Sequence, residues 1–304
     1  MSDMNNMDFD GYKSGFVALV GKPNVGKSTL LNAYIGQTIA AVSYKPQTTR
    51  KRQLGILTRE RAQIIFVDTP GLHSGDYKLS QFINEEARIA LRDSDLLLFV
   101  VDATEPPDQE DRQLAAEIRR DSKVLLVLNK IDQVAPDQLE TREAQYRELY
   151  DFSDVIAISA ITASGREQLL EKVIELLPEG PRFYPEDQIT DVYEREIAED
   201  LIRAAALEYL HEEVPYGIFV RVDDYKPRED GTIYIHATII VERTSHKGIV
   251  IGRGGQMIKQ IGMLAREQIE EMSGQKVFVE LKVKVEKNWR NNSDFLRRNG
   301  LTHS

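Results

Sequence analysis

The sequence predicts an α/β domain with a doubly wound, mostly parallel sheet, followed by a smaller α+β domain. Short apolar runs alternate with longer amphipathic stretches over residues 14–180. A Pro-rich segment comes next, and the rest of the chain is predicted to form helices and long strands in which apolar and polar residues alternate. With 304 residues, the chain is long enough for about two domains that each bury a core.

Near-continuous apolar runs in the first domain predict strands that are covered on both faces, as in a parallel sheet. These runs are 16–20, 63–67, 96–101, 123–128 and 155–159. Amphipathic stretches between them, such as 108–121 and 165–178, predict helices. We expect this domain to span 14–180, after a loose polar tail over 1–13.

The second domain is predicted to follow a linker over 181–190, because residues 178–190 contain three prolines and a glycine and cannot continue a helix. The pattern beyond it is a helix over 193–214, strands over 216–226 and 231–243, a helical segment broken by GRGG at 252–255, and a strand over 276–289. This α-β-β-α-α-β order predicts a separate α+β domain over 191–304.

Composition and charge indicate where the protein acts and which part of it could bind an anionic partner. The chain has no cysteine, which excludes disulfide and thiol chemistry and fits a reducing cytosol. It has no apolar stretch long enough to span a bilayer and no apolar core of a signal peptide, so we expect an intracellular protein. The net charge is −10, yet residues 241–304 contain twelve basic and seven acidic residues. This asymmetry predicts a basic working surface near the C-terminus.

The stretch 21–28 fits the pattern G-x-x-x-x-G-K-S/T between a predicted strand and a predicted helix. Its glycines let successive backbone N–H groups point inward at an anion. Lys27 would reach the β- and γ-phosphates, and the Ser28 hydroxyl would bind Mg²⁺. The predicted phosphate site comprises Gly21, Lys22, Pro23, Asn24, Val25, Gly26, Lys27, Ser28 and Thr29.

Further stretches at strand ends identify the nucleotide. In 68–71, DTPG, Asp68 would hold Mg²⁺ through water and the Gly71 amide would meet the γ-phosphate. In 129–132, NKID, Asp132 can accept two hydrogen bonds from guanine, and the Lys130 stem can pack over the base. The Ala160 amide would face guanine O6. All these stretches belong to one sheet edge, which predicts a GTP site. Beyond the phosphate loop it comprises Asp68, Thr69, Pro70, Gly71, Leu72, Asn129, Lys130, Ile131, Asp132, Ser159 and Ala160.

The segment between the phosphate loop and DTPG should carry a threonine that binds Mg²⁺ and senses the γ-phosphate. We choose Thr49 over Thr48, and expect the cluster Arg50-Lys51-Arg52 to be solvated rather than to touch RNA. Leu72 stands where a water-orienting glutamine is found in Ras-like switches, so intrinsic GTP hydrolysis should be slow. The predicted catalytic residues are Lys27, Thr49 and Gly71, and the predicted Mg²⁺ ligands are Ser28, Thr49 and Asp68.

The stretch 247–262, KGIVIGRGGQMIKQIG, fits the GXXG loop between two helices that clamps backbone nucleotides in KH domains. Apolar residues around the loop would form a groove wall or core. The predicted RNA-binding residues are Lys247, Gly252, Arg253, Gly254, Gly255 and Lys259.

With these motifs the chain resembles the Era family of bacterial GTPases over about residues 13–300. The matching stretches are GKPNVGKSTLLN, KPQTTRKR, VDTPGLH, NKID and ISA, then FYPED, EVPY, VER, KGIVIGRGGQMIKQIG and VKVEKNW. The resemblance implies a type II KH domain, binding near the 3′ end of 16S rRNA, and a role in small-subunit assembly. It also implies a loose association with the inner membrane surface, and we expect a monomer. Leu72 fits, since this family carries a hydrophobic residue there.

Alternatives remain open. The second domain could bind another RNA or a protein partner, and a P-loop metabolic kinase is a third class that the guanine-reading NKID disfavours. Asn24 is where related GTPases without the glutamine use an asparagine to help hold K⁺; the alternative is that Asn24 only closes the turn.

Overall fold

The computed structural model describes residues 11–43, 49–70 and 77–302. Contacts divide the chain into two compact units, and each is described by itself. The first consists of Met1–Gly36, Arg52–Thr69 and Ala87–Asp191; the second consists of Gln37–Lys51, Pro70–Glu86 and Val192–Ser304. The sequence placed the division at 181–190, close to Asp191, but did not predict that two segments of the first half group with the second unit.

The first unit is built on a six-stranded sheet in the order β2-β3-β1-β4-β5-β6. All neighbouring strands are parallel except β2, which pairs antiparallel with β3 at the edge. The strands are β1 Lys13–Val20, β2 Gln53–Arg59, β3 Ala62–Asp68, β4 Leu96–Asp102, β5 Val124–Asn129 and β6 Asp154–Ala157. The doubly wound sheet is confirmed, and the antiparallel β2 is an addition to it.

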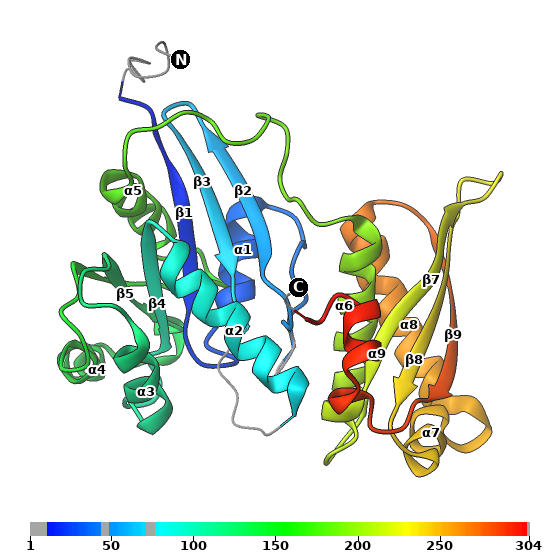
Figure 1. Cartoon of the computed structure of the whole chain (residues 1–304). Helices are drawn as coiled ribbons and strands as arrows, with labels where there is room; N and C mark the ends of the chain where they lie inside the picture. The colour runs from blue at the N-terminus through cyan, green and yellow to red at the C-terminus, as the bar shows by residue number, and fades with distance from the viewer. Residues whose placement is uncertain (1–10, 44–48, 71–76, 303–304) are drawn as a thin grey trace. The chain divides into compact units, whose positions relative to one another are not determined.

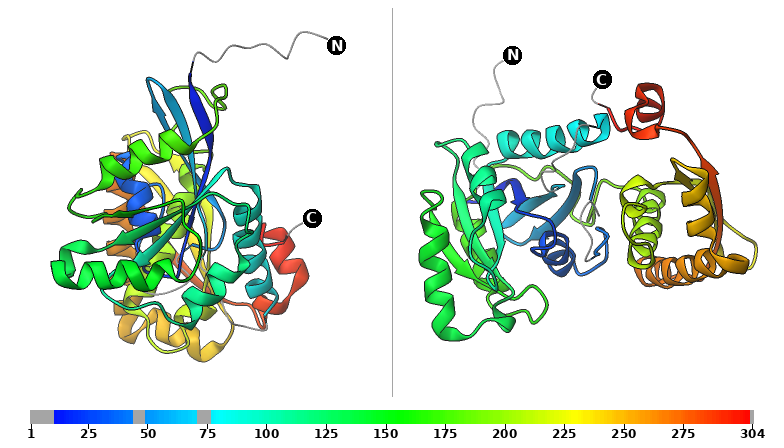
Figure 2. Two further views of the ribbon diagram at one scale, coloured as in Figure 1. Left: turned by 90° about the vertical axis from the view of Figure 1, so that its left-hand side faces the viewer. Right: turned by 90° about the horizontal axis from the view of Figure 1, so that it is seen from below.

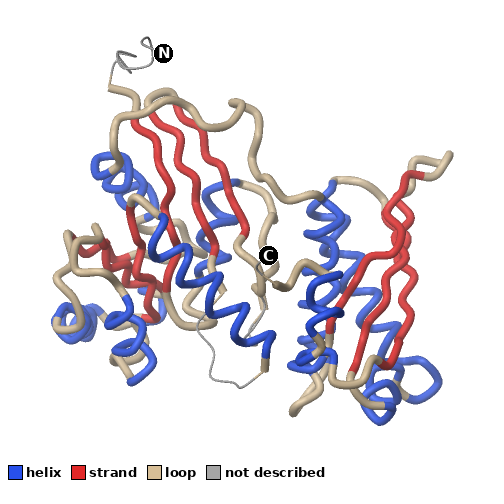
Figure 3. Tube along the Cα trace, in the orientation of Figure 1, coloured by secondary structure: helices blue, strands red, loops and turns tan. Residues whose placement is uncertain are grey.

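Helices cover both faces of this sheet (Figure 3), which explains why its strands are near-continuously apolar. On one face the Tyr34 ring stacks on Phe66, and its hydroxyl donates to the Arg166 carbonyl where another helix begins. The helices are α1 Lys27–Ile35, α3 Gln109–Glu117, α4 Pro136–Arg147 and α5 Arg166–Leu176, with a short 3₁₀ turn η1 Ile131–Gln133. Helix α2, Lys78–Asp93, which is labelled in Figure 1, contributes residues to both units by the division given above.

The predicted linker is attached to the first unit. The Gln63 side chain accepts from the Phe183 and Tyr184 amides, and the Thr190 hydroxyl donates to the Leu54 carbonyl at 2.7 Å. The Ile56 amide donates to Ile189. This stretch contains no helix, as its prolines predicted, and it lies along the edge strand β2 and its neighbour β3.

The second unit has the predicted order α-β-β-α-α-β. Its elements are α6 Glu194–Tyr209, β7 Phe219–Pro227, β8 Ile233–Val241, α7 Thr244–Ile251, α8 Gln256–Ser273 and β9 Val277–Val285, with 3₁₀ turns η2 Pro215–Gly217 and η3 Arg253–Gly255. Strand β8 is central, antiparallel to β7 and parallel to β9. Helices α6 and α8 pack side by side (Figure 2), and the sheet residues Ile235, Ala237 and Ile239 are fully buried.

The last strand is shorter than predicted. β9 ends at Val285 rather than at 289, because Asn288 adopts a left-handed conformation with φ 53° and turns the chain into η4, Trp289–Asn291, and α9, Ser293–Arg298. These elements close an apolar cluster that includes the first half of α2. We call it the tryptophan cluster; its residues are Leu79, Phe82, Ile83, Phe219, Ile240, Trp289, Phe295, Leu296 and Leu301.

Among residues 11–43, 49–70 and 77–302, no helix has the length and apolar character needed to cross a membrane.

Candidate functional site

The phosphate loop follows β1 and opens α1, as its pattern predicts. Gly21 and Gly26 both have positive φ, 154° and 101°, and a Cβ atom on either would collide with its surroundings. On Gly21 it would lie 2.1 Å from the Val100 carbonyl oxygen, and on Gly26 it would lie 2.3 Å from Asn129 Nδ2. Only glycine lets the backbone come this close, so the glycines of the motif are required by packing as well as by the anion nest.

Lys27 lies inside the loop and is 7% exposed. Its ammonium donates to the carbonyl oxygens of Gly21 at 2.7 Å and Lys22 at 2.8 Å. Burial lowers the pKa of Lys27 to about 8, and the Asp68 carboxylate opposes this effect. A phosphate anion in the loop would act in the same direction as Asp68 and favour the charged ammonium.

Ser28 and Asp68 are 40 residues apart in sequence and meet at the site, where the Ser28 hydroxyl donates to Asp68 Oδ2 at 2.7 Å. A hydroxyl and a carboxylate are oxygen donors of the kind Mg²⁺ prefers, so this pair fits the predicted ion. Thr69 is buried and donates to the Leu19 carbonyl, which anchors the end of β3 to β1.

Several predicted residues stay predictions. Thr49 groups with the second unit, so its role as a Mg²⁺ ligand is not assigned by this geometry. Gly71 and Leu72 lie outside the described residues, as does Thr48, the alternative to Thr49.

The NKID motif begins at Asn129, which is the last residue of β5 and is buried. The Asn129 amide donates to the Val25 carbonyl at 2.7 Å, and its Oδ1 accepts from the Ala160 amide at 2.9 Å. Asn129 thereby connects the phosphate loop to the turn after β6. The Ala160 amide, which we expected to face guanine O6, is occupied by Asn129 here, while Ser159 is buried and Asp132 is exposed in η1.

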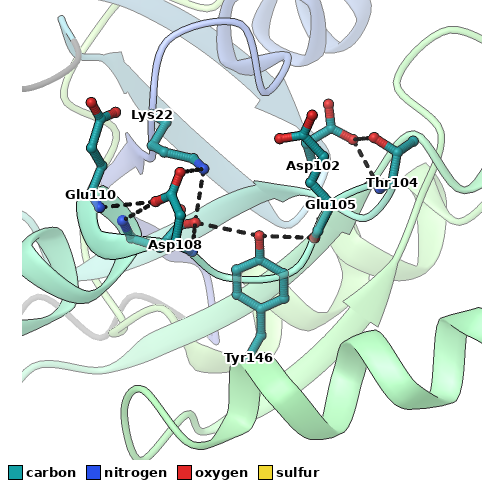
Figure 4. A network of polar contacts seen from close by, with 8 residues as sticks. Lys22, Asp102, Thr104, Glu105, Asp108, Glu110 and Tyr146 are labelled. Carbon is teal, nitrogen blue, oxygen red and sulfur yellow. Dashed lines mark hydrogen bonds and ion pairs between the residues drawn. The ribbon is translucent and has the colours of Figure 1, made fainter.

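Lys130 has φ 66°, and its ammonium donates to Asp102 Oδ2 at 2.5 Å. Asp102 ends β4, and its Oδ1 accepts from the Thr104 amide and hydroxyl (Figure 4). Burial acts to raise the pKa of Asp102, but the hydrogen bonds with Lys130 and Thr104 outweigh it and lower that pKa. Sequence reasoning missed Asp102; its position at a strand end beside β5 was the available signal.

Most of the residues that are predicted to contact RNA around the GXXG loop are accessible on the surface. Arg253, Gly254 and Lys259 are exposed, Lys247 is half-buried, and Gly254 has φ 58° with no neighbouring atom within 4 Å of where a Cβ would stand. Ile249, 47% exposed, lies on the surface rather than in the core. The geometry therefore leaves the side chains of Arg253 and Lys259 accessible around the turn between α7 and α8.

One expectation about the basic cluster is wrong. Arg50 is not solvated: it is 5% exposed, its guanidinium donates to the Ile218 carbonyl at 2.8 Å, and it lies 5.6 Å from the centre of the Trp289 ring. Lys51 and Arg52 are exposed, as expected. The contacts of Arg50 come from residues more than 160 positions away, which no local pattern reveals.

Comparison with known families identifies both units. Residues 16–130 match the family model of the 50S ribosome-binding GTPases, and residues 213–290 match that of the KH domain. The two matches agree with the phosphate and guanine motifs in the first unit and with the GXXG turn in the second.

Similar proteins cover both matched regions in one chain. GTPase Era of Caldanaerobacter subterraneus subsp. tengcongensis is 48% identical over 291 residues, covering 95% of this chain and 98% of that protein. Era of Geotalea daltonii is 44% identical over 290 residues, covering 95% and 98%. Crystal structures of an Aquifex aeolicus Era variant bound to GDP and aluminium fluoride, and of Era with MgGDPNP and nucleotides 1506–1542 of 16S rRNA, each match with a TM-score of 0.90 at 36% identity, covering 96% of this chain and 100% of theirs. The chain belongs to the Era family of GTPases.

Proposed function

We propose that this protein is a GTP-hydrolysing switch that binds 16S rRNA near its 3′ end and acts in assembly of the small ribosomal subunit. The observation that carries the proposal is the presence, in one chain, of a phosphate loop with the Ser28–Asp68 pair that fits Mg²⁺ and of an exposed GXXG turn. The solved Era complex contains both MgGDPNP and nucleotides 1506–1542 of 16S rRNA, which supports the same pair of ligands here.

The RNA part of the proposal is tested with a fragment of the 16S rRNA 3′ end. Arg253 is exposed at the GXXG turn, so Arg253→Glu should weaken RNA binding about tenfold at physiological salt, because a phosphate contact is replaced by repulsion. The control is Arg297→Glu, an identical charge change at a side chain that is 73% exposed in α9. Fluorescence anisotropy at several salt concentrations measures both.

Equal losses in the two variants would mean that the GXXG turn does not hold the RNA. Wild-type binding that does not distinguish the 16S fragment from a scrambled RNA of equal length would favour the alternative, in which the second domain serves another RNA or a protein partner.

For hydrolysis, we propose that Asn24 helps hold a K⁺ ion that supplies positive charge to the developing transition state. Asn24 is exposed in the phosphate loop with φ 66°. Replacing K⁺ with Na⁺ should lower kcat for GTP several-fold, and Asn24→Ala should remove this ion dependence. A kcat that is the same in both salts would leave Asn24 as a turn residue only.

The remaining assignments are part of the same proposal. Mg²⁺ is held by Ser28 and Asp68, and Thr49 joins them when GTP is bound. The protein works in the cytoplasm as a monomer, and its loose association with the inner membrane surface follows from the family resemblance alone. Co-sedimentation with anionic vesicles tests that association.

A further inference from the structure

The side chain of Lys22 is paired with two carboxylates, so we do not assign it to phosphate binding. Its ammonium lies 2.8 Å from Asp108 Oδ2 and 2.9 Å from Asp111 Oδ2, and the side chain is only 14% exposed (Figure 4). Asp108 is the N-cap of α3 and accepts from the Glu110 and Asp111 amides. The second residue of the phosphate loop is therefore fastened to the start of another helix.

Asp111 makes this attachment strong. Its side chain is fully buried, and within the described parts of the chain its Oδ1 has no hydrogen-bond partner. The Tyr146 hydroxyl lies 3.5 Å from Asp111 Oδ2, a long contact. Lys22 is thus the main cation facing a buried carboxylate, and removing it leaves an uncompensated charge, which is costly in a protein interior.

The loop between β4 and α3 connects this ion pair to the guanine motif. Asp102 at its first end holds Lys130, and Asp108 at its last end holds Lys22. Helix α4 fixes the middle: Arg142 donates to the Ala103 and Thr104 carbonyls, and the Tyr146 hydroxyl donates to the Glu105 carbonyl at 3.4 Å. One short loop therefore contacts a phosphate-loop lysine at one end and the NKID lysine at the other; Figure 4 shows Asp102 and Asp108 at its two ends, with Lys22 beside Asp108.

The backbone of Lys22 adds a second link. Its carbonyl oxygen accepts from the Lys27 ammonium at 2.8 Å, so the position of Lys22 also sets where the phosphate-binding lysine rests. A shift of Lys22 would therefore move the Lys27 ammonium through this hydrogen bond.

We propose that Lys22, with Asp108 and Asp111, is a positioning cluster that couples the phosphate loop to the guanine-binding Lys130 through the β4–α3 loop and Asp102. Lys22 then controls how long a guanine nucleotide stays bound, and does not act on the bond that is cleaved. This inference rests on the GTP binding proposed above.

The test compares Lys22→Met and Lys22→Arg in the full chain, using the release of a fluorescent GDP and the single-turnover hydrolysis of bound GTP. Lys22→Met should speed GDP release about tenfold or more, since a charged hydrogen-bonded pair is lost. The fold-change in GDP release should exceed the fold-change in hydrolysis of bound GTP, and Lys22→Arg should restore most of the slow release.

Lys172→Met is the matched control, because Lys172 also contacts two carboxylates, Asp154 at 3.2 Å and Glu175 at 3.1 Å, but these side chains are 40% and 65% exposed rather than buried. Its release rate should equal that of the wild type. If Lys22→Met fails to fold, Lys22→Met/Asp111→Asn carries the comparison, since it leaves no unpaired buried charge.

The coupling to Lys130 is tested by a double-mutant cycle of Lys22→Met with Asp102→Asn on GDP release. Sub-additive effects support it, and strictly additive effects overturn it. Unchanged release in Lys22→Met, an equal defect in Lys22→Arg, or a loss of hydrolysis with normal release would each contradict the positioning role. Failure of the wild type to bind guanine nucleotides would instead overturn the proposed function.

Discussion

Asn129 and Asp132 lie three residues apart and have different environments. Asn129 is 2% exposed and makes hydrogen bonds to the phosphate loop and to the turn after β6, whereas Asp132 is exposed in η1. Asn129 connects two loops of the protein, whereas the Asp132 carboxylate is accessible to a ligand. We therefore propose that Asp132, rather than Asn129, selects the base.

Asp132→Ala should lower the affinity for GTP and GDP by about 100-fold or more, because two hydrogen bonds to a charged acceptor are lost. The exposed neighbour Gln133 provides the control, Gln133→Ala, which should bind normally. Calorimetric titration with GTP, GDP and ATP measures the effect. Equal affinity of the wild type for ATP and GTP would disprove the guanine assignment.

At the residue scale, sequence reasoning succeeded where a motif carries its own context. It foresaw that Ser28 and Asp68 would converge, because both stand at the same edge of a parallel sheet. It could not foresee the partners of Lys22 or the burial of Arg50. Both depend on contacts between distant segments, Lys22 with Asp108 and Arg50 with Ile218, and the sequence around either residue contains no sign of them.

At the scale of elements, α6 carries a carboxyl group with a shifted titration. Glu199 Oε1 accepts from the Val222 amide of β7 at 2.8 Å. Burial, and to a lesser extent Asp200, raises the pKa of Glu199, while the hydrogen bond from the Val222 amide and the charges of Lys51 and Arg195 oppose the shift; the resulting pKa is about 7. A carboxyl group whose pKa is raised on folding holds its proton longer in the folded than in the unfolded chain. Its contribution to stability is therefore greatest at low pH and is lost as the pH rises from about 4.5 to about 7.

Glu199→Gln keeps an acceptor for the Val222 amide and removes the titration. Between pH 5 and pH 7.5, the unfolding free energy of the wild type should fall relative to that of the variant by about 1–3 kcal/mol. Urea unfolding followed by the fluorescence of Trp289, the chain's single tryptophan, measures it within the same unit. Glu208→Gln, on the exposed side of α6, is the control. Parallel pH profiles for wild type and Glu199→Gln would contradict this account.

The elements that the sequence did not predict share a physical cause. β2 is an edge strand of mixed polarity, α4 has few buried residues, and the C-terminal turn after β9 is stabilised by the tryptophan cluster rather than by local pattern. Periodicity identifies elements that bury a regular face, such as β4 and β5. It cannot identify elements that are held by partners far away in the sequence.

At the scale of the whole chain, the segment that should sense the γ-phosphate makes contacts within the C-terminal unit. Gln37–Lys51 groups with the C-terminal unit, where Gln37 Nε2 donates to the Met272 carbonyl at 2.8 Å and Arg50 lies against Trp289. Arg50 directly follows Thr49. A change at Thr49 on GTP binding would therefore act on residues that pack within the RNA-binding unit, which is a physical basis for coupling the two ligands.

A switch of the proposed kind requires GTP and RNA binding to be coupled, and the most direct measurement is the affinity for the 16S rRNA 3′ fragment with a non-hydrolysable GTP analogue and with GDP. RNA should bind about 5- to 150-fold tighter with the analogue, and the RNA should tighten analogue binding over GDP binding by the same factor. Arg50→Ala should reduce this ratio, because it removes the contacts with Ile218 and Trp289. Identical RNA affinities in the two nucleotide states would show two independent binding units and contradict the proposed switch.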